Sequence, residues 1–262
     1  MCYDLAFDTT IESILDYFPN LQFSDQTTIH FDFRAHYQAQ GYPKYPVIIR
    51  ERGLPSLVMF EWGVIANYMD TPEKIKKMRN SMCNAQSEKI LDDKRSVWYR
   101  LKKNRCVIPT SGIYEHREVK GFKNKIPYFV KIANRNVFFL PGLYEYSKPD
   151  VETGEMTGTF TLITRSANDL MRSIHNGGEN QFRMPLFLQP EQAAKWIDPS
   201  LTEEQIREIL QYELPSEELV YHTVFTIRGK NLRTDQQPQH APFEWANLPP
   251  LGTDAVEENT LF

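Results

Sequence analysis

The second residue of this chain is a cysteine, and its position gives it chemistry that an internal cysteine lacks. If the initiator Met1 is removed, Cys2 carries an α-amine and a thiol on the same residue. An α-amine titrates near ~7.7–8.0, so a useful fraction is neutral and nucleophilic at neutral pH. The amine can form a Schiff base with an aldehyde, and the thiol can then close a thiazolidine ring. A cysteine at position 2 is more often incidental than functional, so this interpretation depends on other residues.

Three further side chains are candidates for a reactive site. Glu115 follows apolar and aromatic residues at the expected end of a strand, an environment that suits a carboxyl to proton transfer near neutral pH. His175 precedes a glycine-containing loop, and histidine is the side chain best suited to move protons at pH 7. Asn84 offers an acceptor and donors that can orient an amine or a sugar hydroxyl. The structural alternatives are a surface glutamate, a histidine at a helix C-terminus and a helix-capping or turn asparagine.

Basic residues are concentrated between residues 74 and 105, although the chain as a whole carries a net charge of −4. That net charge excludes a uniformly basic nucleic-acid binder but leaves room for a local basic surface. Aromatic residues lie within or near the same segment, and single-stranded nucleic acid needs cations for its phosphates and flat partners for its bases. The segment predicts salt-sensitive binding of single-stranded nucleic acid. Replacing Lys102 and Arg105 with acidic residues is expected to weaken this binding. Two solvated helix faces are the structural alternative.

The composition is that of a soluble globular protein, with 262 residues of which 41% are hydrophobic and 24% charged. The three cysteines, Cys2, Cys83 and Cys106, are odd in number and irregularly spaced, which argues against a disulfide framework or a four-cysteine zinc site. The histidines show no metal-ligand spacing, and we predict neither a metal nor a cofactor. The sequence contains no segment that resembles a signal peptide or a membrane span, so we expect an intracellular protein without a membrane partner.

Hydrophobic periodicity predicts many strands and a few short helices. The expected strands are 28–36, 46–50, 56–64, 126–132, 136–144, 159–164 and 219–227. The expected helices are 8–19, 72–79, 93–103, 166–174, 190–197 and 202–212. Because the helices are interspersed without a regular βαβ alternation, the sequence predicts an α+β fold. We expect one domain over residues 1–232 and a C-terminal extension, 233–262, that wraps the surface or is disordered.

Taken in order, these segments resemble the SOS response-associated peptidase (SRAP) family of abasic-site-crosslinking proteins. Each matching segment is weak alone, but their combination and order are specific and cover most of residues 1–230. The matching segments are Met1-Cys2, Trp62-Gly63, Asn84-Ala85-Gln86-Ser87-Glu88, Pro109-Thr110-Ser111-Gly112-Ile113-Tyr114-Glu115, and His175 with Arg183-Met184-Pro185.

The resemblance implies curved, mainly antiparallel sheets that form a barrel-like core with flanking helices around a positively charged cleft. It implies that Cys2 traps a ring-opened abasic site in single-stranded DNA as a thiazolidine, as part of the DNA damage (SOS) response. Asn84 then positions Cys2, Glu115 is the acid or base, and His175 assists sugar-ring opening. We assign the DNA contacts to Trp62, Gln86, Lys102, Arg105, Arg183, Met184 and Pro185.

The same resemblance sets expectations for the whole protein. We expect a crosslinking enzyme of the peptidase, hydrolase or lyase class, whose partner is single-stranded DNA containing abasic sites. We also expect a monomer that is cytoplasmic and joins the bacterial nucleoid when it is bound to DNA.

The chain departs from the family pattern at four places. Tyr3-Asp4 stand where the family has glycine and arginine, Gln86 replaces an arginine, and His116 replaces a tryptophan. Residues 176–182 separate His175 from Arg183, and this insertion could move His175 away from the cleft. The loss of two basic residues predicts a weaker grip on phosphate, while the nucleophile, the acid or base and the histidine remain.

Two functions from other classes compete with this interpretation. Cys2, His175 and Asn84 have the residue types of a thiol peptidase, although self-cleavage before Cys2 would release only Met1. A non-catalytic single-strand binder is the other alternative, favoured if Asp4 and Gln86 mark the decay of a once active site.

Overall fold

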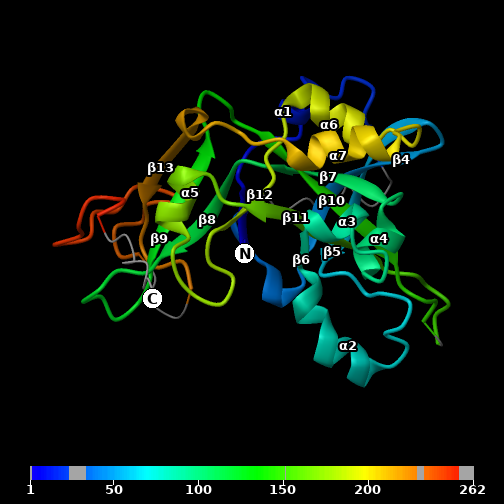
Figure 1. Ribbon diagram of the computed structural model, residues 1–262, viewed down its shortest axis with the longest axis horizontal. Coiled ribbons are helices and arrows are strands. Elements are labelled where there is room, and N and C mark those ends of the chain that lie inside the picture. Colours follow the sequence, from blue (N-terminus) through cyan, green and yellow to red (C-terminus); the bar gives the residue numbers. More distant parts are fainter. Residues whose placement is uncertain (1, 24–33, 151, 229–232, 254–262) are drawn as a thin grey trace, which may run out of the picture.

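The computed structural model describes residues 2–23, 34–150, 152–228 and 233–253 of the chain. Two mainly antiparallel sheets form its core, and short helices flank them (Figure 1). The predicted α+β fold with a barrel-like core is therefore confirmed. Within the described residues, no helix has the length and apolar composition needed to cross a membrane.

The larger sheet closes on itself. Its central strands follow the order β11-β10-β7-β4-β5, and β5 pairs again with β11 through Thr159 opposite Glu61 and Phe160 opposite Trp62. Closure of this kind gives the central strands partners on both sides and buries a continuous core. The strands of the ring are β4 (Lys44–Glu51), β5 (Leu54–Trp62), β7 (Arg105–Thr110), β10 (Phe138–Tyr146) and β11 (Gly158–Ser166).

Strand β11 is the hub of the larger sheet, because it pairs with four other strands. Besides β10 and β5, it pairs in parallel with β6 (Asn84–Gln86) and antiparallel with β12 (Arg183–Pro185). Thr164 stands opposite both Gln86 and Pro185, so β6 and β12 lie on opposite edges of the same short stretch. This arrangement brings together two segments that are far apart in the sequence. A further short strand, β2 (Gln22–Phe23), pairs with β5.

The smaller sheet places the start of the chain between two other strands. Its order is β13-β9-β8-β1-β3, and every neighbouring pair is antiparallel. Asp4 of β1 stands opposite Tyr114 of β8 on one side and Gln38 of β3 on the other, so Cys2 enters the sheet beside β8. The strands are β1 (Asp4–Phe7), β3 (Arg34–Gln38), β8 (Gly112–Arg117), β9 (Ile126–Ile132) and β13 (Leu219–Thr223).

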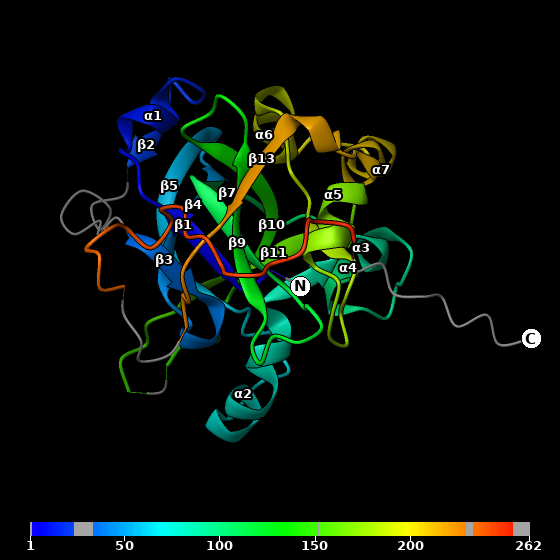
Figure 2. The ribbon, with the colours of Figure 1, turned by 90° about the vertical axis from the view of Figure 1, so that its left-hand side faces the viewer.

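The helices are short and lie on the outside of the sheets. Helices α1, α6 and α7 gather at one end of the molecule, and α2 projects from the opposite end (Figures 1 and 2). Helix α2 buries none of its side chains, as expected for a solvated helix. The helices are α1 (Glu12–Leu15), α2 (Pro72–Met78), α3 (Glu88–Leu91), α4 (Val97–Leu101), α5 (Asp169–Ile174), α6 (Pro190–Trp196) and α7 (Glu203–Gln211).

Local patterns predicted most elements but missed several limits. The hairpin of β4 and β5 turns at Arg52 and Gly53, whose positive φ values of 49° and 83° suit a tight hairpin turn. The helix expected over 93–103 is limited to α4, because the Ser96 side chain caps it by accepting from Trp98 N. Most of the strand expected over 28–36 lies outside the described residues. Glu115 stands inside β8 rather than at a strand end.

Residues 233–253 cross the outer side of the smaller sheet (Figure 2). Pro242 forms an isolated bridge with Val224, and Trp245 Nε1 donates to the Val224 carbonyl at 3.0 Å. The fully buried Arg117 of β8 donates to the carbonyl oxygens of Pro249 and Pro250 at 3.0 and 2.8 Å. This stretch therefore wraps the surface, while the domain limits 1–232 and 233–262 stay predictions.

Candidate functional site

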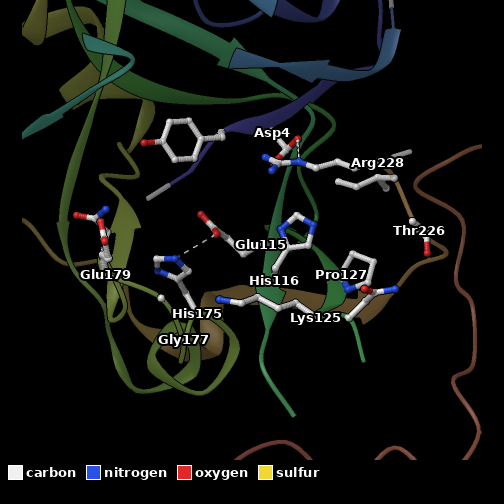
Figure 3. A pocket seen from close by; sticks show the side chains of 15 residues that line it. Asp4, Glu115, His116, Lys125, Pro127, His175, Gly177, Glu179, Thr226 and Arg228 are labelled. Carbon is white, nitrogen blue, oxygen red and sulfur yellow. Dashed lines mark hydrogen bonds and ion pairs between the residues drawn. The ribbon is translucent and has the colours of Figure 1, made fainter. Parts of the chain in front are cut away.

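A cavity of about 540 Å³ opens where the start of β1 meets β8 and the beginning of β9 (Figure 3). The loop that follows His175 and the residues after β13 complete its walls. The lining residues are Tyr3, Asp4, Glu115, His116, Asn124, Lys125, Pro127, His175, Gly177, Gly178, Glu179, Asn180, Thr226, Ile227 and Arg228.

Glu115 and His175 face each other inside this cavity (Figure 3). Their side chains are 3% and 10% exposed, and His175 Nε2 lies 3.9 Å from Glu115 Oε2. This distance is too long for a direct hydrogen bond, but a small proton-carrying group of a ligand can approach both atoms. Glu115 Oε1 is buried and has no hydrogen-bond partner among the described residues. The arrangement suits proton transfer to and from a bound molecule.

His175 is oriented by the backbone of the neighbouring strand. It ends α5, and its Nδ1 lies 2.8 Å from the carbonyl oxygen of Arg183 in β12. Arg183 N also lies 3.3 Å from Nδ1 and donates to it, so the backbone of Arg183 offers this nitrogen both an acceptor and a donor, and Nε2 is the atom that faces Glu115. Burial lowers the pKa of His175, and the charge of Glu115 only partly opposes this effect. Burial therefore favours the neutral ring, which is the form that can accept a proton.

Cys2 lies behind the cavity. It is fully buried in this chain, from which Met1 has not been removed. Its thiol donates to the carbonyl oxygen of Asp4 at 3.5 Å. Burial raises the pKa of the Cys2 thiol well above its usual range, and the negative charge of Glu115 raises it further. Cys2 lies two residues before Asp4, which pairs with Tyr114 next to Glu115, so the two segments run side by side.

Asn84 is a buried amide with no hydrogen-bond partner. It begins β6, opposite Leu162 of the hub strand, and is 5% exposed. Neither its oxygen nor its nitrogen has a partner in the described part of the chain. A buried polar group without a partner costs about 1–3 kcal/mol, so its presence calls for a reason other than stability.

The segment 176–182 does not carry His175 away from the site. Phe182 N donates to the His175 carbonyl oxygen at 2.8 Å, so the two ends of the loop meet. Asn176 fixes the loop to the residue that follows β8, because its side chain accepts from Glu118 N at 2.7 Å and donates to Glu118 O at 2.9 Å. The residues that follow Asn176 form one wall of the cavity, so the insertion shapes the site.

Three of the residues predicted to contact DNA are buried in the core. The Trp62 indole is fully buried and stacks on Phe160 with ring centroids 5.9 Å apart. Met184 and Pro185 of β12 are also buried, and the Met184 sulfur accepts from Asn168 N at 3.2 Å. We revise the assignment of Trp62, Met184 and Pro185 from DNA contact to core packing.

Arg105 and Lys102 also serve the fold. Arg105 is 5% exposed, and its guanidinium donates to the carbonyl oxygens of Lys102, Trp196 and Asp198 at 2.8, 2.7 and 2.5 Å. The Lys102 ammonium pairs with Glu203 of α7 at 2.5 Å. Neither side chain is among those that line the cavity. Because Arg105 is buried, we revise its assignment from DNA contact to a structural contact between β7 and the α6–α7 region, while the DNA contact of Lys102 stays a prediction.

Arg105→Ala is therefore expected to lower the free energy of unfolding by about 2–4 kcal/mol, because three backbone carbonyls lose a charged, buried donor. Denaturant unfolding measures the loss. The matched control is Arg207→Ala, which breaks a surface pair with Asp92 and should cost less than about 1 kcal/mol. Equal stability of the two variants would show that the buried contacts of Arg105 are not needed.

Gln86 and Arg183 are the two predicted DNA-contacting residues that remain partly exposed beside the site. They lie on opposite edges of β11, and the backbone of Arg183 contacts His175. Arg183 pairs with Glu88 through two bonds of 2.7 and 2.9 Å, and it also donates to the Thr164 carbonyl oxygen at 2.8 Å. A ligand would have to compete with Glu88 for this guanidinium.

Two basic residues that line the cavity were not predicted from the sequence. These are Lys125 and Arg228, and neither belongs to a recognised motif. The only sequence signal at Arg228 is its place directly after the expected strand 219–227. In the described residues, no group of three or more histidine, cysteine, aspartate or glutamate side chains could hold a metal ion.

The fold and the site together define an α+β protein that places a cysteine, a glutamate and a histidine around the first strand of the chain. The chain belongs to the SOS response associated peptidase (SRAP) family, whose model matches residues 1–229. The predicted family membership is therefore confirmed.

Several relatives in this family have names that describe a function. The chain is 29% identical over 212 residues to the abasic site processing protein YoqW of Bacillus subtilis, with 80% of this chain and 87% of that protein covered. It is 27% identical over 220 residues to the abasic site processing protein YMR114C of Saccharomyces cerevisiae, with 81% and 55% covered.

Solved structures share the fold. A crystal structure of a protein from Bacteroides thetaiotaomicron matches with a TM-score of 0.74 at 26% identity, and the match covers 92% of this chain and 97% of that one. A protein from Bordetella bronchiseptica matches with a TM-score of 0.68 at 22% identity over 86% of this chain and all of that chain, which supports the fold alone.

Proposed function

We propose that this protein processes abasic sites in single-stranded DNA by forming a covalent thiazolidine with the opened sugar, after Met1 has been removed. The observation that carries the proposal is the pairing of Asp4 with Tyr114, which sets the start of the chain, with Cys2, next to the strand that carries Glu115, while Glu115 and His175 face each other in an open cavity. The names of the relatives support abasic DNA as the substrate. One chain supplies all of these residues, so we propose that a monomer is sufficient.

The chemistry needs an aldehyde, and an abasic sugar is mostly ring-closed. In the proposed first step, His175 accepts the proton of the anomeric hydroxyl and returns it to the ring oxygen as the bond between that oxygen and the anomeric carbon breaks, which opens the ring. The Cys2 amine then attacks the aldehyde carbon to form a carbinolamine. Glu115 accepts the amine proton and returns a proton to the hydroxyl, which leaves as water. The thiol adds to the imine carbon, its proton passes to the nitrogen, and the ring closes with one water lost overall.

The contacts disfavour a thiol peptidase. A peptidase nucleophile needs a thiol with a lowered pKa and a histidine oriented by a third group. Burial instead raises the pKa of the Cys2 thiol, and Asn84 makes no hydrogen bond to His175. A Schiff-base route starts from the amine and does not depend on a thiolate in the resting protein. A non-catalytic binder would not explain why the Asn84 amide is buried without a hydrogen-bond partner among the described residues.

Mass spectrometry of the intact protein after incubation with an abasic oligonucleotide tests the proposal. The expected mass is that of the protein without Met1 plus the oligonucleotide minus one water. An oligonucleotide with a tetrahydrofuran analogue, which has no aldehyde, is the control and should give no adduct. Peptide turnover without an adduct would support the peptidase, and reversible binding alone would support the non-catalytic binder.

Asn84→Ala is expected to separate stability from activity. Removing a buried amide that has no partner should leave the free energy of unfolding unchanged or raise it by about 1 kcal/mol. Capture of abasic DNA should slow, because Asn84 is proposed to position Cys2 or the sugar. Single-turnover crosslinking and denaturant unfolding measure the two effects. A variant that loses stability and keeps its rate would assign Asn84 to the fold.

A further inference from the structure

We propose that Arg228 contacts a backbone phosphate next to the abasic sugar, and that the buried Asp4 is the positioning residue that holds the Arg228 guanidinium at the cavity. This inference rests on the proposed function and adds to it a side chain that grips the DNA strand. It also accounts for the aspartate that stands where the family resemblance predicts an arginine.

The geometry of the pair fixes the plane of the guanidinium. Arg228 Nε lies 3.1 Å from Asp4 Oδ1, and Nη2 donates to Asp4 Oδ2 (Figure 3). Such a two-point contact between arginine and a carboxylate is directional as well as strong. The Arg228 side chain is 39% exposed and lines the cavity. A guanidinium has five N–H donors, so donors remain for a second anion on the exposed side.

The buried Asp4 carboxyl group is stabilised in its ionised form by its neighbours. Its side chain is only 2% exposed, and His36 Nε2 lies 2.7 Å from its Oδ1. Burial alone would raise the pKa of Asp4, but the hydrogen bonds from His36 and Arg228 outweigh that effect and hold the pKa below its usual range. A long arginine side chain loses conformational freedom when it binds a ligand, and a partner that already holds it lowers that cost.

The other charges around the cavity favour this place for a phosphate. Glu115 and Glu179 carry carboxyl groups on the cavity wall, and Figure 3 shows Arg228 on the opposite side of Glu115 from Glu179. Lys125 is the other lining side chain with a fixed positive charge; its ammonium lies 3.1 Å from Glu118 and points toward His175, on the side of the cavity away from Arg228 (Figure 3). Arg228 therefore combines exposure, positive charge and a fixed orientation.

The test measures non-covalent binding of a single-stranded oligonucleotide that contains a tetrahydrofuran abasic analogue. This ligand has no aldehyde, so binding is separated from crosslinking. Arg228→Gln should weaken binding roughly tenfold, because one charge-assisted contact is lost. It should also reduce the slope of log K against log salt by about 0.7, the value for one phosphate contact on a single strand. Arg228→Lys keeps the charge and should retain the slope while losing part of the affinity.

The matched control is Arg207→Gln, which removes another partly exposed arginine paired with an aspartate, on α7 and outside the cavity. It should change neither the affinity nor the salt slope. Asp4→Asn should weaken binding less than Arg228→Gln does. The double variant should bind no more weakly than Arg228→Gln alone, because Asp4 acts through Arg228.

Three outcomes would overturn the inference. The first is that the wild type does not bind the analogue measurably, and the second is that Arg228→Gln keeps the wild-type affinity and salt slope. The third is that the losses of affinity add in the double variant, which would give Asp4 a general structural role. The proposed function fails separately, if wild-type protein forms no adduct with a natural abasic strand. If Asp4→Asn does not fold, the salt slope of Arg228→Gln still decides the phosphate contact.

Discussion

Replacement of Cys2 by alanine is expected to abolish stable covalent capture of abasic DNA. Alanine keeps an α-amine but has no thiol, so any Schiff base reverts by hydrolysis instead of closing to a thiazolidine. Cys2→Ser should likewise form a Schiff base that borohydride traps, but no adduct that survives without reduction. Denaturing gel electrophoresis with and without borohydride, followed by intact mass, distinguishes these species.

Cys106→Ala is the matched control for this experiment. Cys106 is as deeply buried as Cys2, but it lies in β7 and its nitrogen is an amide. Its loss should leave the crosslinking yield unchanged. Crosslinked protein that still carries Met1 would contradict the mechanism, because a blocked amine cannot form the imine.

Glu115→Gln and His175→Ala are each expected to slow crosslinking of natural abasic DNA by about 10²–10⁴-fold, the usual effect of losing an acid or base. The two should differ on a simple open-chain aldehyde, which needs no ring opening. His175→Ala should recover most of its rate there, and Glu115→Gln should not. Single-turnover rates on both substrates measure the difference, with Glu145→Gln, a half-buried glutamate of β10, as the control.

The pH dependence provides a second check on His175. Because burial lowers its pKa, His175 stays neutral below the ordinary histidine range and protonates only as the pH falls through the lowered pKa. The rate on natural abasic DNA should therefore hold down to a pH below about 6.5 and then fall. The unfolded chain takes up this proton at a higher pH, so folding stability is also lost as the pH falls through this interval. A wild-type rate for His175→Ala on natural abasic DNA would leave the ring a purely structural role.

The residues assigned to the site were named from their types and their local sequence, and their roles stay predictions. Cys2 lies two residues before β1 and Glu115 lies within β8, but β1 was not among the expected strands, so the pairing that brings the two segments together is known only from the structure. His175 ends a helix whose limits follow from its periodicity and from the Asn168 side chain that caps it. The family resemblance, which rests on the order of these segments along the chain, implied that they form one site.

The failed assignments concern long-range contacts that no local pattern contains. A cluster of basic residues predicts a surface, but Arg105 is buried because carbonyl oxygens at the end of α6 need a donor. The ion pair of Asp4 with Arg228 is also outside any local pattern, because the two residues are far apart in the sequence, and the weaker grip on phosphate stays a prediction. The insertion after His175 suggested displacement, and the two bonds of Asn176 to Glu118 prevent it.

The central place of β1 in the smaller sheet has a consequence for the maturation of the protein during translation. Asp4 pairs with Tyr114, so the first strand is made long before its partner on β8 leaves the ribosome. At about 5–20 residues per second, the delay is on the order of 5–20 s. During that time the N-terminus is open to an aminopeptidase, whereas the folded sheet buries Cys2 completely. The proposed mechanism therefore requires that Met1 be removed before this sheet closes, because a chain that folds first would keep its amine blocked.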